Sequence, residues 1–387
     1  MVTSGPVKDV SAFLASKQQQ FASDEALLKE WNDIEEMYNK KLWHQLTLKL
    51  LNIVKYPSLQ KNEELLSLYN NFIQIIETRI NPLALVEMLV EVVKQFKDPK
   101  EAIALLEATE TKVKHKQEAV ILCQILEGQI KLEKLNDQEA TLKQIEEIDK
   151  LMNELDGVTS VHARYYLLAS QVYRLQGKFA EYYQSALKYL GCIELSDLSA
   201  KEQVQHGFLL GLAALLGESI YNLGELLAHP ILDSLKSTPN WWLVELLYAF
   251  NAGDIAKFEK MKPKWSSIPD IATQEIKLRQ KISLLCLMEM AFKKPSNNRR
   301  LTFNEISAES KLPLSDVEHL VMKALSLGLI KGSIDQVASI VNITWVQPRV
   351  LDKSQLANMI QRLDVWCKDV KSMEHLMENK AQDILTL

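Results

Sequence analysis

Glycine, proline and cysteine are scarce in this chain of 387 residues, and their scarcity narrows the possible folds. Only 12 Gly and 11 Pro are present, while runs rich in Leu, Ala, Glu, Lys and Gln recur along the chain. A mostly helical protein is therefore expected. Cys123, Cys192, Cys286 and Cys367 lie far apart, and none belongs to a CxxC pair. Free thiols buried in a reducing compartment are expected, which favours the cytosol and the nucleus.

Long apolar runs and an excess of basic residues are also missing. The most apolar run, Phe208 to Leu216, is about half of the roughly 20 residues that a membrane span needs. The N-terminus lacks the apolar core behind a basic start that defines a signal peptide. With a net charge of −5 and a pI near 5.9, the chain has no global positive field. Neither nucleic acid nor membrane is expected as a partner.

The sequence motifs of common catalytic sites are absent as well. There is no GxxxxGK[ST] or GxGxxG phosphate loop, no HExxH or HxH metal motif and no GxSxG elbow. The seven histidines are scattered without ligand spacing. His319 beside Glu318, and Cys367 with Lys371 at i+4, come closest to a reactive arrangement, but a surface histidine and an unactivated thiol are the simpler interpretations. We expect no enzyme, no catalytic or metal residue and no cofactor, although an unrecognised active site stays an alternative.

Helices with recognisable starts and stops fill the chain from about residue 23 to 292. Starts are expected at Asn81-Pro82, Asp98-Pro99, Asn136 with Glu139, Ser199 with Glu202, and Thr238-Pro239. Residues 165–183 and 246–258 each consist of a helix, a glycine turn and a second helix. Such a hairpin cannot bury its apolar face alone and must stack on neighbours. We predict a right-handed solenoid of tetratricopeptide-like hairpins, with a compact irregular bundle as the alternative.

Residues 301–346 carry the helix signals of a winged helix, in which two helices precede a β-hairpin. Thr302 with Glu305, and Ser315 with Glu318, have capping-box spacing. The first helix is expected from residue 303 to about 310. The second places its apolar residues on one face; these are Val317, Leu320, Val321, Ala324 and Leu325.

The expected hairpin completes this module. Gly328 suits the left-handed position after the second helix, and Leu329 and Ile330 open a strand. Val341, Ile343 and Trp345 alternate along the next strand and are the candidate interaction residues of the winged helix.

The charge of the winged helix argues against DNA binding. Residues 299–346 contain as many acidic as basic residues, and Asp316 and Glu318 lie at the start of the second helix, which meets base edges in DNA-binding members. A module used to dock proteins is the better interpretation.

The C-terminal stretch predicts a long amphipathic helix. Its apolar residues recur at alternating spacings of three and four; they are Leu356, Met359, Leu363, Trp366, Val370, Met373 and Met377. We call these seven residues the seam. The stripe must be buried, either against its own domain or against helices of other chains, and a Met-rich seam suits adaptable contacts.

Taken together, these parts resemble the PCI domain, which is shared by the proteasome lid, the signalosome and a translation initiation factor. Residues 161–346 carry the resemblance, in YYLLASQVYRLQGKFAEYYQSALKYLG (165–191), STPNWWLVELLYAFNAGDIAKFEKM (237–261) and LTFNEIS…LPLSDVEHLVMKALSLGLIKGSIDQV (301–337). It implies a helical-repeat solenoid over 1–160, the helical part of a PCI domain over 161–296, its winged helix over 297–346 and a bundling helix over 347–387.

The resemblance also implies a function. A non-catalytic scaffold of the proteasome regulatory particle lid is expected, acting in ubiquitin-dependent degradation in cytoplasm and nucleus. It would contact other PCI subunits through winged-helix edges and a shared C-terminal helix bundle, as a hetero-oligomer. The alternative is a PCI scaffold of another large complex, such as the signalosome or an initiation or mRNA export assembly, with possible RNA contact.

Overall fold

The computed structural model describes residues 10–21, 25–56, 58–60, 63–294, 298–350 and 353–385. They form two compact units, residues 1–193 and 194–387. The predicted boundaries at 160, 296 and 346 concern smaller parts and stay predictions; the boundary at 296 lies outside the described residues.

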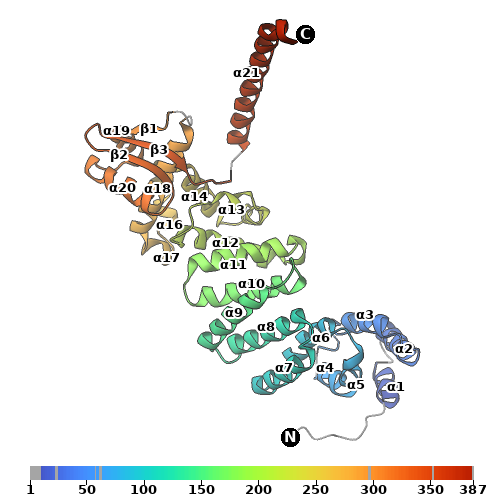
Figure 1. Cartoon of the computed structure of the whole chain (residues 1–387). Coiled ribbons are helices and arrows are strands. Elements are labelled where there is room, and N and C mark those ends of the chain that lie inside the picture. The colour runs from blue at the N-terminus through green and yellow to red at the C-terminus, as the bar shows by residue number, and fades with distance from the viewer. Residues whose placement is uncertain are drawn as a thin grey trace. The chain divides into compact units, whose positions relative to one another are not determined.

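The first unit is built from antiparallel helical hairpins, as the repeating starts and stops predict (Figure 1). Its helices are α1 (Val10–Gln20), α2 (Glu25–Asn39), α3 (Trp43–Ile53), α4 (Glu64–Leu68), α5 (Gln74–Ile76), α6 (Pro82–Lys94), α7 (Pro99–Val113), α8 (Gln117–Glu133), α9 (Gln138–Met152), α10 (Ser160–Leu175) and α11 (Phe179–Cys192). A π-helical turn, Tyr69–Ile73, links α4 to α5. One continuous apolar core joins the hairpins and includes the fully buried Trp31, Phe72 and Leu168.

Most of the predicted helix starts are confirmed by their hydrogen bonds. The Asn81 side chain accepts from the Leu83 amide at 3.1 Å, Asp98 caps α7, and Ser199 and Glu202 form a reciprocal capping box. Two starts are wrong, one by one residue and the other by two. Asn136 has a left-handed φ of 54°, so Asp137 caps α9 instead, and the residue before α14 is Asn240, not Thr238.

The second unit continues with helices and ends in the winged helix. Its helical layer consists of α12 (Ala200–Leu216), α13 (Gly224–Ala228), α14 (Trp241–Ala252), α15 (Ile255–Lys260), α16 (Lys262–Trp265), α17 (Pro269–Ala272) and α18 (Glu275–Lys293). Short 3-10 turns cover Leu195–Asp197 and Pro230–Leu235. Trp265 stacks on Phe258 with ring centroids 5.1 Å apart, which fixes α16 to α15. Trp241 and Trp242 are half-buried.

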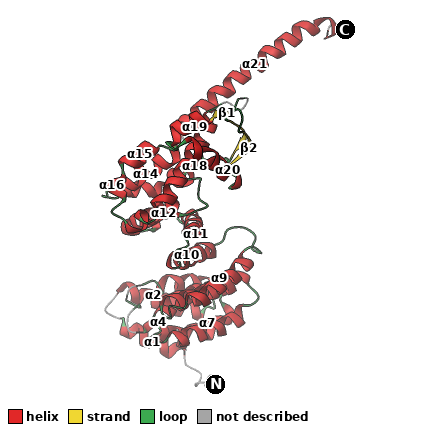
Figure 2. Cartoon of the chain, turned by 90° about the vertical axis from the view of Figure 1, so that its left-hand side faces the viewer, coloured by secondary structure: helices red, strands yellow, loops and turns green. Residues whose placement is uncertain are grey.

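The winged helix has the predicted order and one additional strand (Figure 2). It contains β1 (Arg300–Thr302), α19 (Phe303–Ser310), α20 (Leu314–Ser326), β2 (Ile330–Asp335) and β3 (Ile340–Val346). The sheet is antiparallel in the order β1-β3-β2. Thr302 and Glu305 form the predicted capping box, and Gly328 has a φ of 69°. The second predicted box is wrong. Because α20 starts directly after Pro313, Ser315 lies inside the helix and bonds to Asp316.

Candidate protein-docking surfaces

The predicted seam lies on one uninterrupted helix, α21 (Lys353–Leu385). Every side chain that the structure describes from Leu356 to Glu378 is exposed. The seven seam residues expose between 46% and 63% of their surface, although all of them are apolar. The structure therefore leaves the stripe exposed. A continuous apolar stripe in water is typical of an interaction surface.

The apolar face of α21 is wider than the seam. Ile360 is 60% exposed and lies four residues after Leu356, and Cys367 lies beside Trp366 at the equivalent position one heptad later. A third apolar position in each heptad is typical of a helix in a bundle, whereas a two-stranded coiled coil needs only two. The N-terminal half of α21 is therefore suited to contact more than one neighbouring helix.

The three candidate residues of the winged helix do not share one surface. Val341 and Ile343 are 1% and 4% exposed, so they belong to the core of the winged helix and cannot themselves contact a partner. Trp345, by contrast, is 37% exposed. The ammonium of Lys331 lies 5.0 Å from the centroid of its ring. Of the three, Trp345 alone offers a contact surface.

A β-bulge turns Trp345 outward. Lys331 pairs with Trp345 but Gly332 pairs with Ile343, so Thr344 is an extra residue in β3. The Thr344 hydroxyl donates to the Lys331 carbonyl at 3.1 Å. Without the bulge, strict alternation would place Trp345 on the same face as Ile343. A Cβ atom on Gly332 would lie directly against the Asn342 carbonyl oxygen, so the bulge requires glycine.

Two of the five basic residues in 299–346, Lys311 and Lys323, contact other helices of the second unit. Lys311 pairs with Glu259 at 2.8 Å, and Lys323 donates to Gln280 at 2.8 Å. The Thr302 amide and the Lys294 ammonium lower the pKa of Glu305, which keeps that carboxylate charged. This distribution gives the surface little spare positive charge for phosphates.

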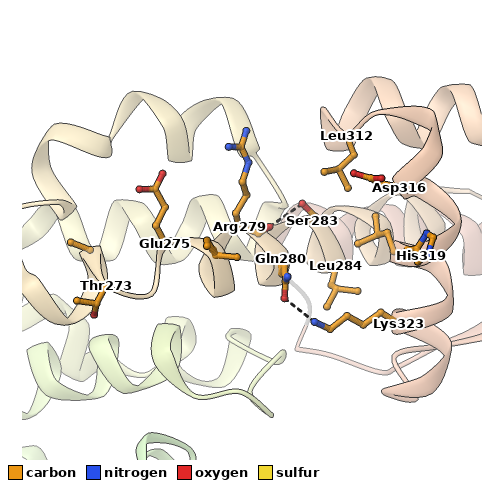
Figure 3. Close-up of a pocket in the computed structure, with 13 residues that line it drawn as sticks. Thr273, Glu275, Arg279, Gln280, Ser283, Leu284, Leu312, Asp316, His319 and Lys323 are labelled. Carbon is orange, nitrogen blue, oxygen red and sulfur yellow. Dashed lines mark hydrogen bonds between the residues drawn. The ribbon is translucent and has the colours of Figure 1, made fainter.

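A groove of about 720 Å³ separates α17 and α18 from α20, as Figure 3 shows. Leu284 and Leu320 are among its apolar lining residues, and the 76% exposed Ile276 stands at its edge. His319 points into it as an exposed side chain. This groove could not be predicted from the sequence, because Ile276 fits the apolar pattern of a buried helix and only the packing of α18 leaves it in water.

Cysteine thiols and metal-binding side chains are the remaining groups that could be reactive. Cys123 and Cys286 are buried as expected, and burial raises the pKa of their thiols to about 12 and about 11. The expectation was wrong for Cys192, which is half-buried, and for Cys367, which is exposed on α21. Within the described residues, no group of three His, Cys, Asp or Glu side chains could hold a metal ion. No helix in the same residues is long and apolar enough to cross a membrane.

Two sequence families match this chain. The family described as "PSD13 N-terminal repeats" covers residues 30–247, which is more than half of the chain, and the "PCI domain" family covers residues 258–345. The chain belongs to the PSD13 family. The second match also confirms the predicted winged-helix type, since it contains α19, α20, β2 and nearly all of β3.

Relatives similar over almost their whole length support the same family. The chain is 39% identical over 368 residues to "26S proteasome non-ATPase regulatory subunit 13" of Dictyostelium discoideum, covering 92% of this chain and 94% of that protein. Homolog B of the same subunit in Arabidopsis thaliana is 39% identical, with 92% and 95% covered. "26S proteasome regulatory subunit RPN9" of Saccharomyces cerevisiae is 34% identical over 378 residues, with 94% and 95% covered.

Proposed function

We propose that this chain is a non-catalytic scaffold subunit of the lid of the proteasome regulatory particle and supports ubiquitin-dependent protein degradation. Its partners would be other PCI subunits, in a hetero-oligomer that works in cytoplasm and nucleus. The observation that carries the proposal is the similarity over 92% of the chain to a relative named as a 26S proteasome subunit. That relative is also named "non-ATPase", which agrees with a role that is not catalytic.

Two surfaces support a role in assembly. The seam is an apolar stripe along a helix whose described side chains are exposed from Leu356 to Glu378, and Trp345 is an aromatic residue turned outward at the sheet. Aromatic residues dominate the binding energy of many protein interfaces. The balanced charge of the winged helix, and the contacts of Lys311 with Glu259 and of Lys323 with Gln280, favour protein partners over nucleic acid. We therefore assign the seam to a helix bundle and Trp345 to a contact with a neighbouring winged helix.

Three substitutions within the seam test the bundle assignment. In the full-length chain, Leu363→Asp, Trp366→Asp and Val370→Asp together would place three carboxylates in an apolar interface. Burying even one unpaired charge costs several kcal/mol, so lid affinity should fall by at least about 1,000-fold. The measurement is incorporation of the purified variant into a lid preparation that lacks this subunit, followed by native mass spectrometry.

A matched control lies on the polar face of the same helix. Asn358→Asp, Gln361→Asp and Ser372→Asp change the net charge by the same amount at exposed positions outside the seam. This variant should assemble like the parent chain. If both variants assemble normally, α21 is not a bundling helix; if both fail equally, charge and not the seam controls assembly.

A further inference from the structure

A short segment that leads from the winged helix to α21 is held on the helical layer of the second unit. We call residues 347–350 the strap. It follows β3 directly, and the Gln347 amide donates to the Leu329 carbonyl at 2.8 Å. Arg349 turns inward, pairs with Glu289 of α18 and donates to the Asn251 carbonyl of α14 at 3.2 Å. Its guanidinium also lies 5.3 Å from the ring centroid of Phe292.

The ion pair in the strap is buried. The side chains of Arg349 and Glu289 are only 5% and 11% exposed. A buried ion pair is a poor way to gain stability, because desolvation offsets the attraction and two apolar residues often do as well. Such a pair does fix orientation, because a planar guanidinium hydrogen-bonds a carboxylate in only a few geometries. The pair therefore positions the strap on α18.

The end of the strap is fixed by a second contact, independent of charge. The Val350 amide donates to the Asn222 side chain at 3.4 Å. Val350 lies so close to the first residue of α13, Gly224, that a Cβ atom there would be 2.7 Å from the Val350 Cβ and 2.9 Å from its carbonyl oxygen. Only glycine at position 224 lets the strap pack this closely against α13.

We propose that Arg349 and Gly224 are positioning residues that set where α21 leaves the body carrying the winged helix. The proposal rests on the proposed function, in which one chain engages its neighbours through both Trp345 and the seam. Two linked contacts strengthen each other only if their separation matches that of their binding sites. Because the strap fixes the origin of α21, the seam can bind as an intramolecular step once Trp345 has bound, or the reverse. The strap has this effect without contacting a partner.

The test uses the full-length chain and a lid preparation that lacks this subunit. Gly224→Ala pushes the strap away without creating a buried charge. Glu289→Met with Arg349→Met removes the directional pair while keeping apolar volume, so that the fold is preserved. Gly191→Ala is the matched control, because a Cβ atom at Gly191 meets nothing within 4 Å. Each change is made both in the parent chain and in the variant with the three Asp substitutions in the seam.

With the seam intact, both strap variants should lower lid affinity by about 10–100-fold, and Gly191→Ala should not. With the seam broken, the same changes should cost less than about twofold, because no second contact remains to be positioned. Equal losses in both backgrounds, or no loss in either, would overturn the strap's role. The proposed function fails by a different result, namely that the parent chain itself does not enter the lid preparation.

Discussion

Two glycines of the second unit end helices in the same way and differ in what surrounds them. Gly253 follows α14 with a φ of 67°, and Gly328 follows α20 with a φ of 69°. Each donates its amide to a carbonyl three residues earlier at 3.1 Å. A Cβ atom at Gly328 would meet nothing within 4 Å, whereas at Gly253 it would lie 2.5 Å from the Cys286 Cα and 2.9 Å from its amide nitrogen.

Replacing each glycine by alanine separates backbone strain from crowding. A left-handed alanine costs about 1–2 kcal/mol, which is the whole expected effect of Gly328→Ala. Gly253→Ala adds a clash with the backbone of α18, and overpacking of this kind costs about 1–3 kcal/mol more. One kcal/mol shifts Tm by about 2–4 °C for a domain of about 150–250 residues. Gly328→Ala should then lower Tm by about 2–8 °C and Gly253→Ala by about 4–20 °C.

Thermal unfolding followed by circular dichroism, with urea unfolding as a second measurement, gives both values on the same chain. Because the two substitutions share residue type, φ region and structural unit, their difference reports crowding alone. A Gly253→Ala variant that is no less stable than Gly328→Ala would refute the close approach of Gly253 to α18.

Two further predictions concern a buried acid and the bulge. Burial raises the pKa of Glu127 to about 7, so between about pH 4.5 and 7 the folded state holds more protons than the unfolded state and stability falls as pH rises. In urea unfolding at pH 8, the free energy of unfolding of Glu127→Gln should therefore exceed that of the parent by about 1–3 kcal/mol, whereas at pH 4 the two should be equal. A gain in stability that does not depend on pH would refute the titration of Glu127. Gly332→Ala should remove the bulge and turn the Trp345 side chain away from its outward position, so it should weaken lid affinity about as much as Trp345→Ala. If tryptophan fluorescence shows that Trp345 has moved but lid affinity is unchanged, the outward Trp345 is not a contact.

Most of the fold could be predicted from the sequence, because its signals are local. Asn81, Asp98 and Ser199 satisfy amides two or three residues away, and Gly177 and Gly253 adopt the left-handed turns that end their helices. Where two polar residues compete, local reasoning loses accuracy. Asn136 and Asp137 could both cap α9, and in the structure Asp137 does so.

The candidate site was less predictable, because it depends on contacts between distant residues. Alternation along β3 placed Val341, Ile343 and Trp345 on one face, but a single extra residue, Thr344, separates Trp345 from the other two. The glycine opposite, Gly332, was the available signal for a bulge. The hydrogen-bond partners of Lys281 could not be predicted from any local sequence signal. Its buried ammonium reaches the Ala214, Leu215 and Gly217 carbonyls at the end of α12, while burial lowers its pKa to about 7.

The exposed stripe of α21 has a consequence for the chain before it meets its partners. A newly made copy presents Leu, Met, Trp and Val side chains to water along several helical turns, with the exposed thiol of Cys367 among them. Such a surface promotes self-association, binding by chaperones and degradation by proteases. Cells that make this chain in excess of its partners would therefore clear the surplus, and its abundance would follow theirs. Recombinant production should yield more soluble protein when a partner is made in the same cell.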